Sequence, residues 1–388
     1  MYHGIETGFG RWMVPERRIR FLRWWREKHR GLLPLIAMDV CHIAPYKKDP
    51  LVGDDAFDFI LEYLASAQFL SVHPLFWNEL SYYCYQRRIA CPNLQVLALH
   101  ARDDHPEVDR VTIRSIINLI PASPIQRLSF SGGLITYEDA VLSDAVWSSL
   151  THIAFQDVSL SSHFWFNFIR AVPTLQWAYV NLYELEIDIP NSRKCILPQL
   201  SSLFINSNGD NISELFSDIS LPALHTLSLL FAKQPEDASW EGEPIIPQLH
   251  RILEAAPNIM TLALSELFLS PKDTYFTTST YSTIGAQPFW RHNQRLAHLR
   301  MHRLPTSGLR EFVEHMLIRN VEWFGLDRPE CPIQTITVVD NDLALVGNTT
   351  LSQCRVLGKD VGGFRLKFDD TCLSQQAWES SKTWTSTI

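Results

Sequence analysis

The sequence predicts an α/β solenoid, with a curved parallel sheet on its concave side and helices on its convex side. The main observation is a six-residue phrase with apolar side chains at positions 1, 4 and 6. Copies start at Leu150, Leu175 and Leu200, which are 25 residues apart. Further copies open at Leu94, Ile125, Leu224, Ile259, Leu296 and Ile333. A proline usually stands one or two residues before the phrase. A phrase that recurs every 20 to 50 residues or so is typical of solenoids.

The phrase has the form L-x-x-L-x-L, which is typical of leucine-rich repeats. Segments with helical periodicity lie between the phrases, and most of them end in an apolar residue and a proline, which stops a helix. These segments are 54–65, 113–120, 163–172, 212–219, 248–256 and 309–318. The expected repeat is therefore strand, turn, helix, turn. Stacked neighbours would bury the apolar edges that no single repeat can bury alone.

The repeats divide the chain into three expected parts. Residues 1–32 form a basic N-terminal capping region, 33–340 an irregular leucine-rich-repeat-like solenoid, and 341–388 a C-terminal cap strand and polar tail. Two insertions interrupt the spacing, at 231–247 and 267–295. Each insertion is interpreted either as a tolerated surface loop or as a lid or phosphorylation target.

The phrase is weaker at the two ends of the chain. Leu35, Met38 and Val40 provide a first copy, and Trp77 opens a weaker second one. Residues 362–368 alternate like one more strand.

The N-terminal region carries concentrated positive charge. Residues 11–30 have a local balance of +6, although the whole chain has a net charge of −8. Ile19, Leu22 and Trp25 fall near one stripe of a helix, which favours a capping helix with solvated arginines. Nuclear import, RNA contact and an anionic membrane surface are the alternatives for this segment.

Composition favours an intracellular soluble protein, in the cytoplasm, the nucleus or both. The longest apolar run, 32–38, falls far short of the roughly 18 residues of a membrane helix. The first 30 residues contain no secretory signal pattern. Seven scattered cysteines without a C-x-x-C pair favour reduced thiols. We expect no nucleic-acid partner for the acidic body, because phosphate contacts need rows of basic residues.

The sequence contains none of the common catalytic or cofactor motifs. It has no phosphate-binding glycine loop, no nucleophile elbow and no H-E-x-x-H pair. His298 and His302 have the spacing of helical metal ligands, but they lie in a strand phrase, where they would be about 13 Å apart. We therefore expect a noncatalytic protein without a cofactor or a metal.

The predicted concave face is where we expect a partner protein. Positions 4 and 6 of the phrase point into the core, so positions 3, 5 and 7 point outward. This places an aromatic and amide cluster at the middle of the arc, formed by Trp177, Tyr179, Asn181, Phe204 and Asn206. Solvent-facing aromatics of this kind are typical of interaction hot spots. The alternative is that the chain covers them itself, for example with 231–247.

A second candidate patch is cationic and suits an acidic or phosphorylated partner. It is formed by His298, Arg300 and His302.

The segment 20–25, with Arg20-Phe21-Leu22-Arg23-Trp24-Trp25, leads into 33–38 and then Trp77-Asn78-Glu79-Leu80-Ser81. Together with the proline-preceded phrases, these segments resemble the leucine-rich-repeat-like body of the large fungal F-box family, over about residues 17–340. The resemblance implies that the repeats hold a target for ubiquitination. It also implies that an F-box before this body docks on a Skp-type adaptor and a cullin. No F-box can be read ahead of the first repeat, so an upstream segment would have to supply it.

Two functions follow from this sequence. The first is a protein-recognition solenoid that serves as the substrate receptor of a ubiquitin ligase. The second is a free-standing leucine-rich-repeat interaction protein without a ligase. An enzyme is the least favoured class, because no constellation of residues supports it.

Overall fold

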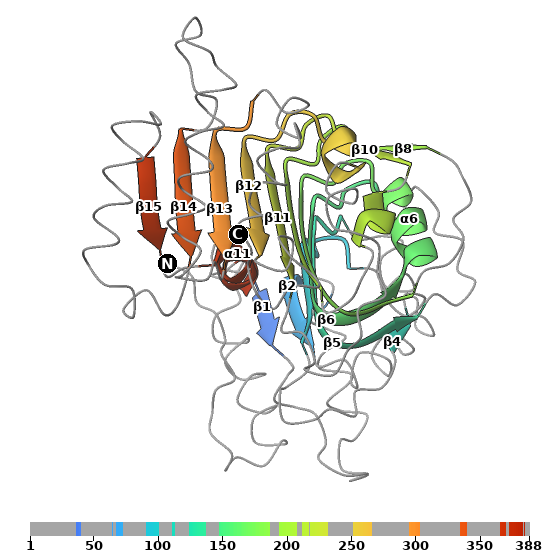
Figure 1. The fold of residues 1–388 in the computed structure, drawn as a ribbon. Coiled ribbons are helices and arrows are strands. Elements are labelled where there is room, and N and C mark those ends of the chain that lie inside the picture. The colour runs from blue at the N-terminus through green and yellow to red at the C-terminus, as the bar shows by residue number, and fades with distance from the viewer. Residues whose placement is uncertain are drawn as a thin grey trace, which may run out of the picture. The chain divides into compact units, whose positions relative to one another are not determined.

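Parallel strands dominate the computed structural model of the chain (Figure 1). The structure describes residues 36–39, 64, 67–72, 91–100, 111–112, 124–136, 147–186, 194–207, 212–216, 218–231, 251–265, 295–302, 334–339, 365–369, 372–382 and 384. The chain divides into two compact units. Unit 1 comprises Met1–Leu160 and Ser380–Ile388, and unit 2 comprises Ser161–Glu379.

Unit 1 contains a sheet of parallel strands in the order β1, β2, β3, β5, β6. A short strand, β4, pairs with the far end of β5. The bounds of these strands are β1 Ile36–Asp39, β2 Ala67–Val72, β3 Val96–His100, β4 Val111–Thr112, β5 Arg127–Thr136 and β6 His152–Ser161.

Unit 2 continues the same design with strands in the order β7, β9, β11, β12, β13, β14, β15, all of them parallel (Figure 1). Their bounds are β7 Trp177–Glu186, β9 Ser202–Ser207, β11 Thr226–Phe231, β12 Thr261–Ser265, β13 His298–His302, β14 Thr335–Val339 and β15 Arg365–Asp369. The chain is thus a parallel β-solenoid, as the recurring phrase predicted.

The register of the strands follows the phrase position by position. Trp177 pairs with Ser202, Ser202 with Thr226, and Thr226 with Thr261. All of these residues occupy position 3. Position 2 extends the ladder, since the amide of His225 donates to the carbonyl of Ser201 at 2.9 Å. Equivalent side chains therefore form straight rows across the sheet, as expected of stacked repeats.

The apolar positions of the phrase form the core. In the phrase that contains β9, Leu200, Leu203 and Ile205 are all at most 2% exposed. The proline before a phrase has a local role. The amide of Leu175 donates to the carbonyl of Val172 at 3.2 Å, so Pro173 occupies the second position of a tight turn. Proline is favoured there because its φ is already suited to the turn.

The second strand lies where the sequence analysis did not place it. β2 pairs with both β1 and β3, and Phe69 is in register with Val96. Ala67 therefore occupies position 1 of a phrase that has a small residue in place of leucine. The predicted copy at Trp77 lies outside the described residues.

Few of the described residues are helical. Helix α6, Ser162–Ala171, confirms the pattern over 163–172, and 251–255 are helical within the predicted 248–256. The helix predicted over 212–219 is wrong in detail. It forms a 3-10 helix, η1 Ile212–Phe216, followed by β10 Ile219–Ser220, which pairs with β8 Cys195–Ile196. The helices predicted at 113–120 and 309–318 lie outside the described residues.

Helix α6 lies away from the sheet, against η1 and β8 (Figure 1). The Nε1 atom of Trp165 donates to the carbonyl of Leu215 at 3.2 Å, and Trp165 is buried. This bond satisfies the polar atom of a large buried side chain.

The C-terminal segment contains more structure than the polar tail that the sequence predicted. Residues 365–369 form β15, which confirms the predicted cap strand, and it extends the sheet by pairing with β14. A helix then follows, α11 Leu373–Lys382. The predictions for residues 1–32, for 231–247 beyond Phe231, and for 267–295 before Arg295 fall outside the described residues.

Candidate protein-binding surface

The predicted aromatic cluster is present on two neighbouring strands of unit 2. Trp177 and Phe204 lie with their ring centroids 5.6 Å apart and tilted by 45°. Tyr179 is in register with Phe204, and the Nδ2 atom of Asn206 donates to the Tyr179 hydroxyl at 3.4 Å. Asn181 is in register with Asn206. The alternation of the strand therefore brings all five predicted residues together.

The cluster does not face solvent as the sequence analysis expected. Tyr179 is 2% exposed and Phe204 is 7% exposed, whereas Trp177 is half-buried. On the next two strands the side chains at position 5 are small and buried, namely Ser228 on β11 and Ala263 on β12. Side chains at position 5 point away from the core that positions 4 and 6 form. Their burial therefore requires a further segment of the chain on this face of the sheet.

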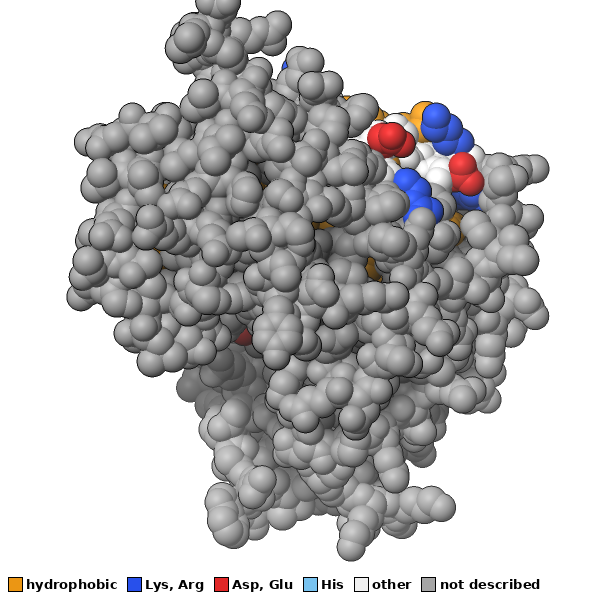
Figure 2. Space-filling view, in the orientation of Figure 1, with side chains coloured by type: hydrophobic (Ala, Val, Ile, Leu, Met, Phe, Trp, Pro, Cys, Tyr) orange, Lys and Arg blue, Asp and Glu red, His pale blue; other side chains and the backbone are white. Residues whose placement is uncertain are grey.

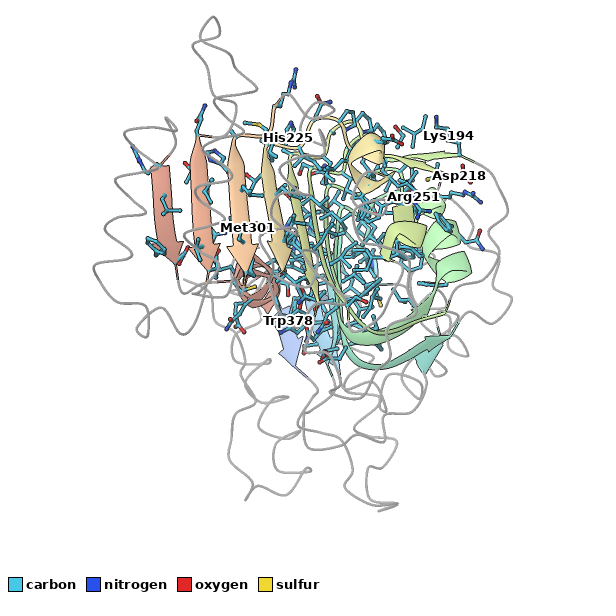
Figure 3. All side chains as sticks on the ribbon, viewed as in Figure 1. Lys194, Asp218, His225, Arg251, Met301 and Trp378 are labelled. Carbon is cyan, nitrogen blue, oxygen red and sulfur yellow. The ribbon has the colours of Figure 1, made fainter. Side chains whose placement is uncertain are left out.

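Helix α11 provides that cover in unit 2. The indole of Trp378 stacks on Tyr179 with a centroid distance of 5.6 Å and an interplanar angle of 26° (Figure 3). The hydroxyls of Ser374 and Ser228 lie 3.1 Å apart, and both residues are fully buried. The alternative that the chain covers its own aromatics is therefore confirmed for Tyr179, which α11 covers; residues 232–247 lie outside the described residues.

The covering face of α11 consists mainly of small residues. Within unit 2, Ser374 and Ala377 are buried at helical spacing, with Trp378 half-buried beside them. Gln375, Gln376 and Glu379 are exposed on the other side. This side of the helix therefore offers the sheet small side chains and one aromatic ring.

We call the face of each sheet that carries positions 3, 5 and 7 its inner wall. In unit 1 a second C-terminal tryptophan lies against this wall. Trp384 is buried, and its ring meets His152 edge-on at 5.8 Å. The guanidinium of Arg127 lies 5.9 Å from the indole, and its Nη1 atom donates to the Trp384 carbonyl at 3.5 Å. Burial lowers the pKa of His152 to about 4, and the charge of Arg127 contributes in the same direction. His152 is therefore neutral at pH 7.

Trp378 and Trp384 were missed by the sequence analysis. The residues Ser374, Ala377 and Ser381 at helical spacing around Trp378 were the available signal.

The cationic patch predicted on β13 is partly neutralised within the chain. The Nη2 atom of Arg300 forms an ion pair with Asp369 Oδ2 at 2.9 Å, and the two side chains are 16% and 33% exposed. His302 is buried, and His298 is half-buried. The strand alternation puts the three residues on one face, as predicted, but Asp369 on β15 compensates the charge of the central one.

The row at position 3 stays accessible in the described part of unit 2. These side chains are half-buried, and the row ends in an exposed arginine on β15. In order across the sheet they are Trp177, Ser202, Thr226, Thr261, His298, Thr335 and Arg365. We call this the position-3 row. It combines one large aromatic, four hydroxyls and two basic residues, a composition suited to hydrogen bonding with a polypeptide.

The outer corner of unit 2 carries mixed charge. On the face shown in Figure 2, the described basic and acidic side chains alternate. Figure 3 labels three of the residues near α6 and β8, Lys194, Asp218 and Arg251. The exposed Ile196 lies on β8, with 58% of its surface accessible. This corner therefore presents charged and exposed apolar side chains, whereas the position-3 row presents mainly hydroxyl groups.

Among the described residues, no group of three or more His, Cys, Asp or Glu side chains is arranged to hold a metal ion. The described free thiols include Cys91 and Cys195, both of which are buried. Burial raises the pKa of Cys91 to about 11 and also raises that of Cys195. These two thiols are therefore protonated at neutral pH and are poor nucleophiles.

No helix in the described part of the chain is long and apolar enough to cross a membrane. A scan against protein-family models found no match for the chain, and a search of curated proteins found no similar sequence.

Proposed function

We propose that the chain is a noncatalytic protein-recognition solenoid that binds a target protein along its inner wall. The observation that carries this proposal is the position-3 row, in which accessible side chains from seven parallel strands form one continuous line. A rigid sheet that presents a line of polar side chains and one aromatic anchor can hold a partner without chemistry of its own.

The finer form of the proposal is a leucine-rich-repeat-like solenoid with helices on its convex side. The position of α6 against η1 and β8 supports it for one repeat. In this form the chain is akin to the substrate-binding body of an F-box protein, and a Skp-type adaptor and a cullin would be its partners. The alternative is a free-standing interaction protein without a ligase. The buried thiols support an intracellular setting, in the cytoplasm or the nucleus, for either form.

The experiment is proximity labelling with the full-length chain, comparing wild type with Trp177→Ala. Ile196→Ala is the matched control, because Ile196 is an exposed apolar residue away from the inner wall. We expect Trp177→Ala to lose partners that wild type and Ile196→Ala share. Identical partner sets for all three proteins would contradict the proposal.

The same labelling separates the two forms of the function. Recovery of a Skp-type adaptor together with a cullin supports the ligase receptor. Target proteins recovered without either of them support the free-standing binder.

A further inference from the structure

Helix α11 occupies the inner wall of unit 2 as a bound peptide would. Its aromatic residue lies against an aromatic of the wall, Trp378 on Tyr179, and its small residue meets a small residue, Ser374 on Ser228. An amphipathic helix laid on a complementary face is a common mode of peptide recognition. The wall is therefore shaped for a helix, and the position-3 row runs beside it.

The attachment of α11 depends on few large side chains. Apart from the half-buried Trp378, the buried residues of its covering face in unit 2 are Ser374 and Ala377, which contribute little apolar area. One aromatic stack and one neutral hydrogen bond are each modest contributions. A helix of ten residues is also marginal in water, so α11 needs the wall in order to be helical.

We propose that the inner wall over β7, β9 and β11 is a helix-binding site that α11 fills in cis. The partner it fits is an amphipathic helix that presents an aromatic ring to Tyr179 and a small residue to Ser228. This proposal rests on the proposed function as a protein binder and specifies the chemistry of its target. A partner helix can bind only those molecules in which α11 has left the wall. Its apparent affinity is therefore the intrinsic affinity multiplied by the fraction of molecules with an open wall.

The test uses a labelled synthetic peptide of residues 370–388, with Cys372 replaced by serine, and measures its binding to full-length protein by fluorescence anisotropy. Trp378→Ala in the protein weakens the cis helix, so we expect the peptide to bind it about tenfold tighter than wild type or more. Gln375→Ala is the matched control, because Gln375 is exposed on the same helix, and it should behave as wild type.

A reversible lock provides the second arm. The protein carries Ser228→Cys and Ser374→Cys in a Cys372→Ser background, because the two native hydroxyls are 3.1 Å apart. Mild oxidation should join the two positions and abolish peptide binding, and reduction of the same sample should restore it. Circular dichroism and thermal melting of each variant confirm that it is folded.

Three results overturn the proposal. These are the failure of the lock to form, equal peptide binding in its oxidised and reduced states, and equal peptide binding by folded Trp378→Ala and wild type. Each outcome is independent of partner capture, so the helix site and the proposed function can fail separately. If the peptide binds as expected but Trp177→Ala labels the same partners as wild type, the helix-binding site stands. The position-3 row is then rejected as the binding face.

Discussion

His152 should make unit 1 less stable in mild acid. Its pKa of about 4 in the folded protein lies below the ordinary value of 6.5, because burial and the charge of Arg127 disfavour the imidazolium. A depressed histidine pKa means that the unfolded chain binds a proton first as the pH falls. The stability is therefore complete above pH 6.5 and declines between pH 6.5 and about 4.

The magnitude at pH 5 follows from the two pKa values. Linkage gives a loss of about 2 kcal/mol relative to pH 7.5, and solvent screening of this partly exposed ring reduces it to about 1 kcal/mol. The comparison variant is His152→Phe, which keeps a ring beside Trp384 but carries no titrating group. The hydroxyl of Thr151 loses its contact with His152 Nδ1 but retains its bond to the Gln126 carbonyl at 3.1 Å.

The assay is urea unfolding of both proteins at pH 7.5 and pH 5, followed by circular dichroism. We expect wild type to lose about 1 kcal/mol more than His152→Phe over this interval. The other titrating groups contribute equally to both proteins, so their effect cancels in the difference between the two free energies of unfolding. A difference in the free energy of unfolding that is the same at both pH values would refute the assignment of a His152 that is neutral in the folded protein at pH 5.

Three further predictions test the core, the ion pair and the thiols. Leu203→Ala removes a fully packed side chain of β9 and should lower the free energy of unfolding by about 2 to 5 kcal/mol in urea titrations. Asp369→Asn leaves the half-buried Arg300 without its counter-charge and should cost about 1 to 2 kcal/mol, whereas a cost unaffected by 1 M salt would argue against an electrostatic cause. Cys91 and Cys195 should resist a thiol reagent at pH 8 in the folded protein and react once urea unfolds it, and rapid labelling without urea would contradict their burial.

The sheet could be predicted from the sequence because one pattern repeats it many times. Position 4 of the phrase is Leu203, Leu227 and Leu262 in neighbouring repeats, and burial of that position sets the register of every strand. Where position 1 is the small Ala67, the pattern loses its most visible mark, and the strand β2 was missed. No proline stands one or two residues before Ala67, so the second mark is absent as well.

The cover over the inner wall could not be predicted from the same pattern. Hydrophobic periodicity identifies elements that bury large apolar side chains, and α11 buries serine and alanine instead. Alternation placed Tyr179 on the inner wall correctly, yet it says nothing about what a distant segment lays over that wall. The ion pair of Arg300 with Asp369 could not be predicted for the same reason, because it joins residues 69 positions apart.

The accessible and the covered rows of the inner wall imply different kinds of recognition. The row at position 5 contacts α11 at Tyr179 and Ser228, and the proposed ligand of that part of the row is therefore a helix. The position-3 row is accessible and rich in hydroxyls, so the target protein that we propose for it would offer many hydrogen-bonding groups. Trp177 contacts Phe204 from the open row and thus links the two. Substitution of Trp177 should therefore weaken a partner that uses either row, whereas substitution of Trp378 should affect only the covered one.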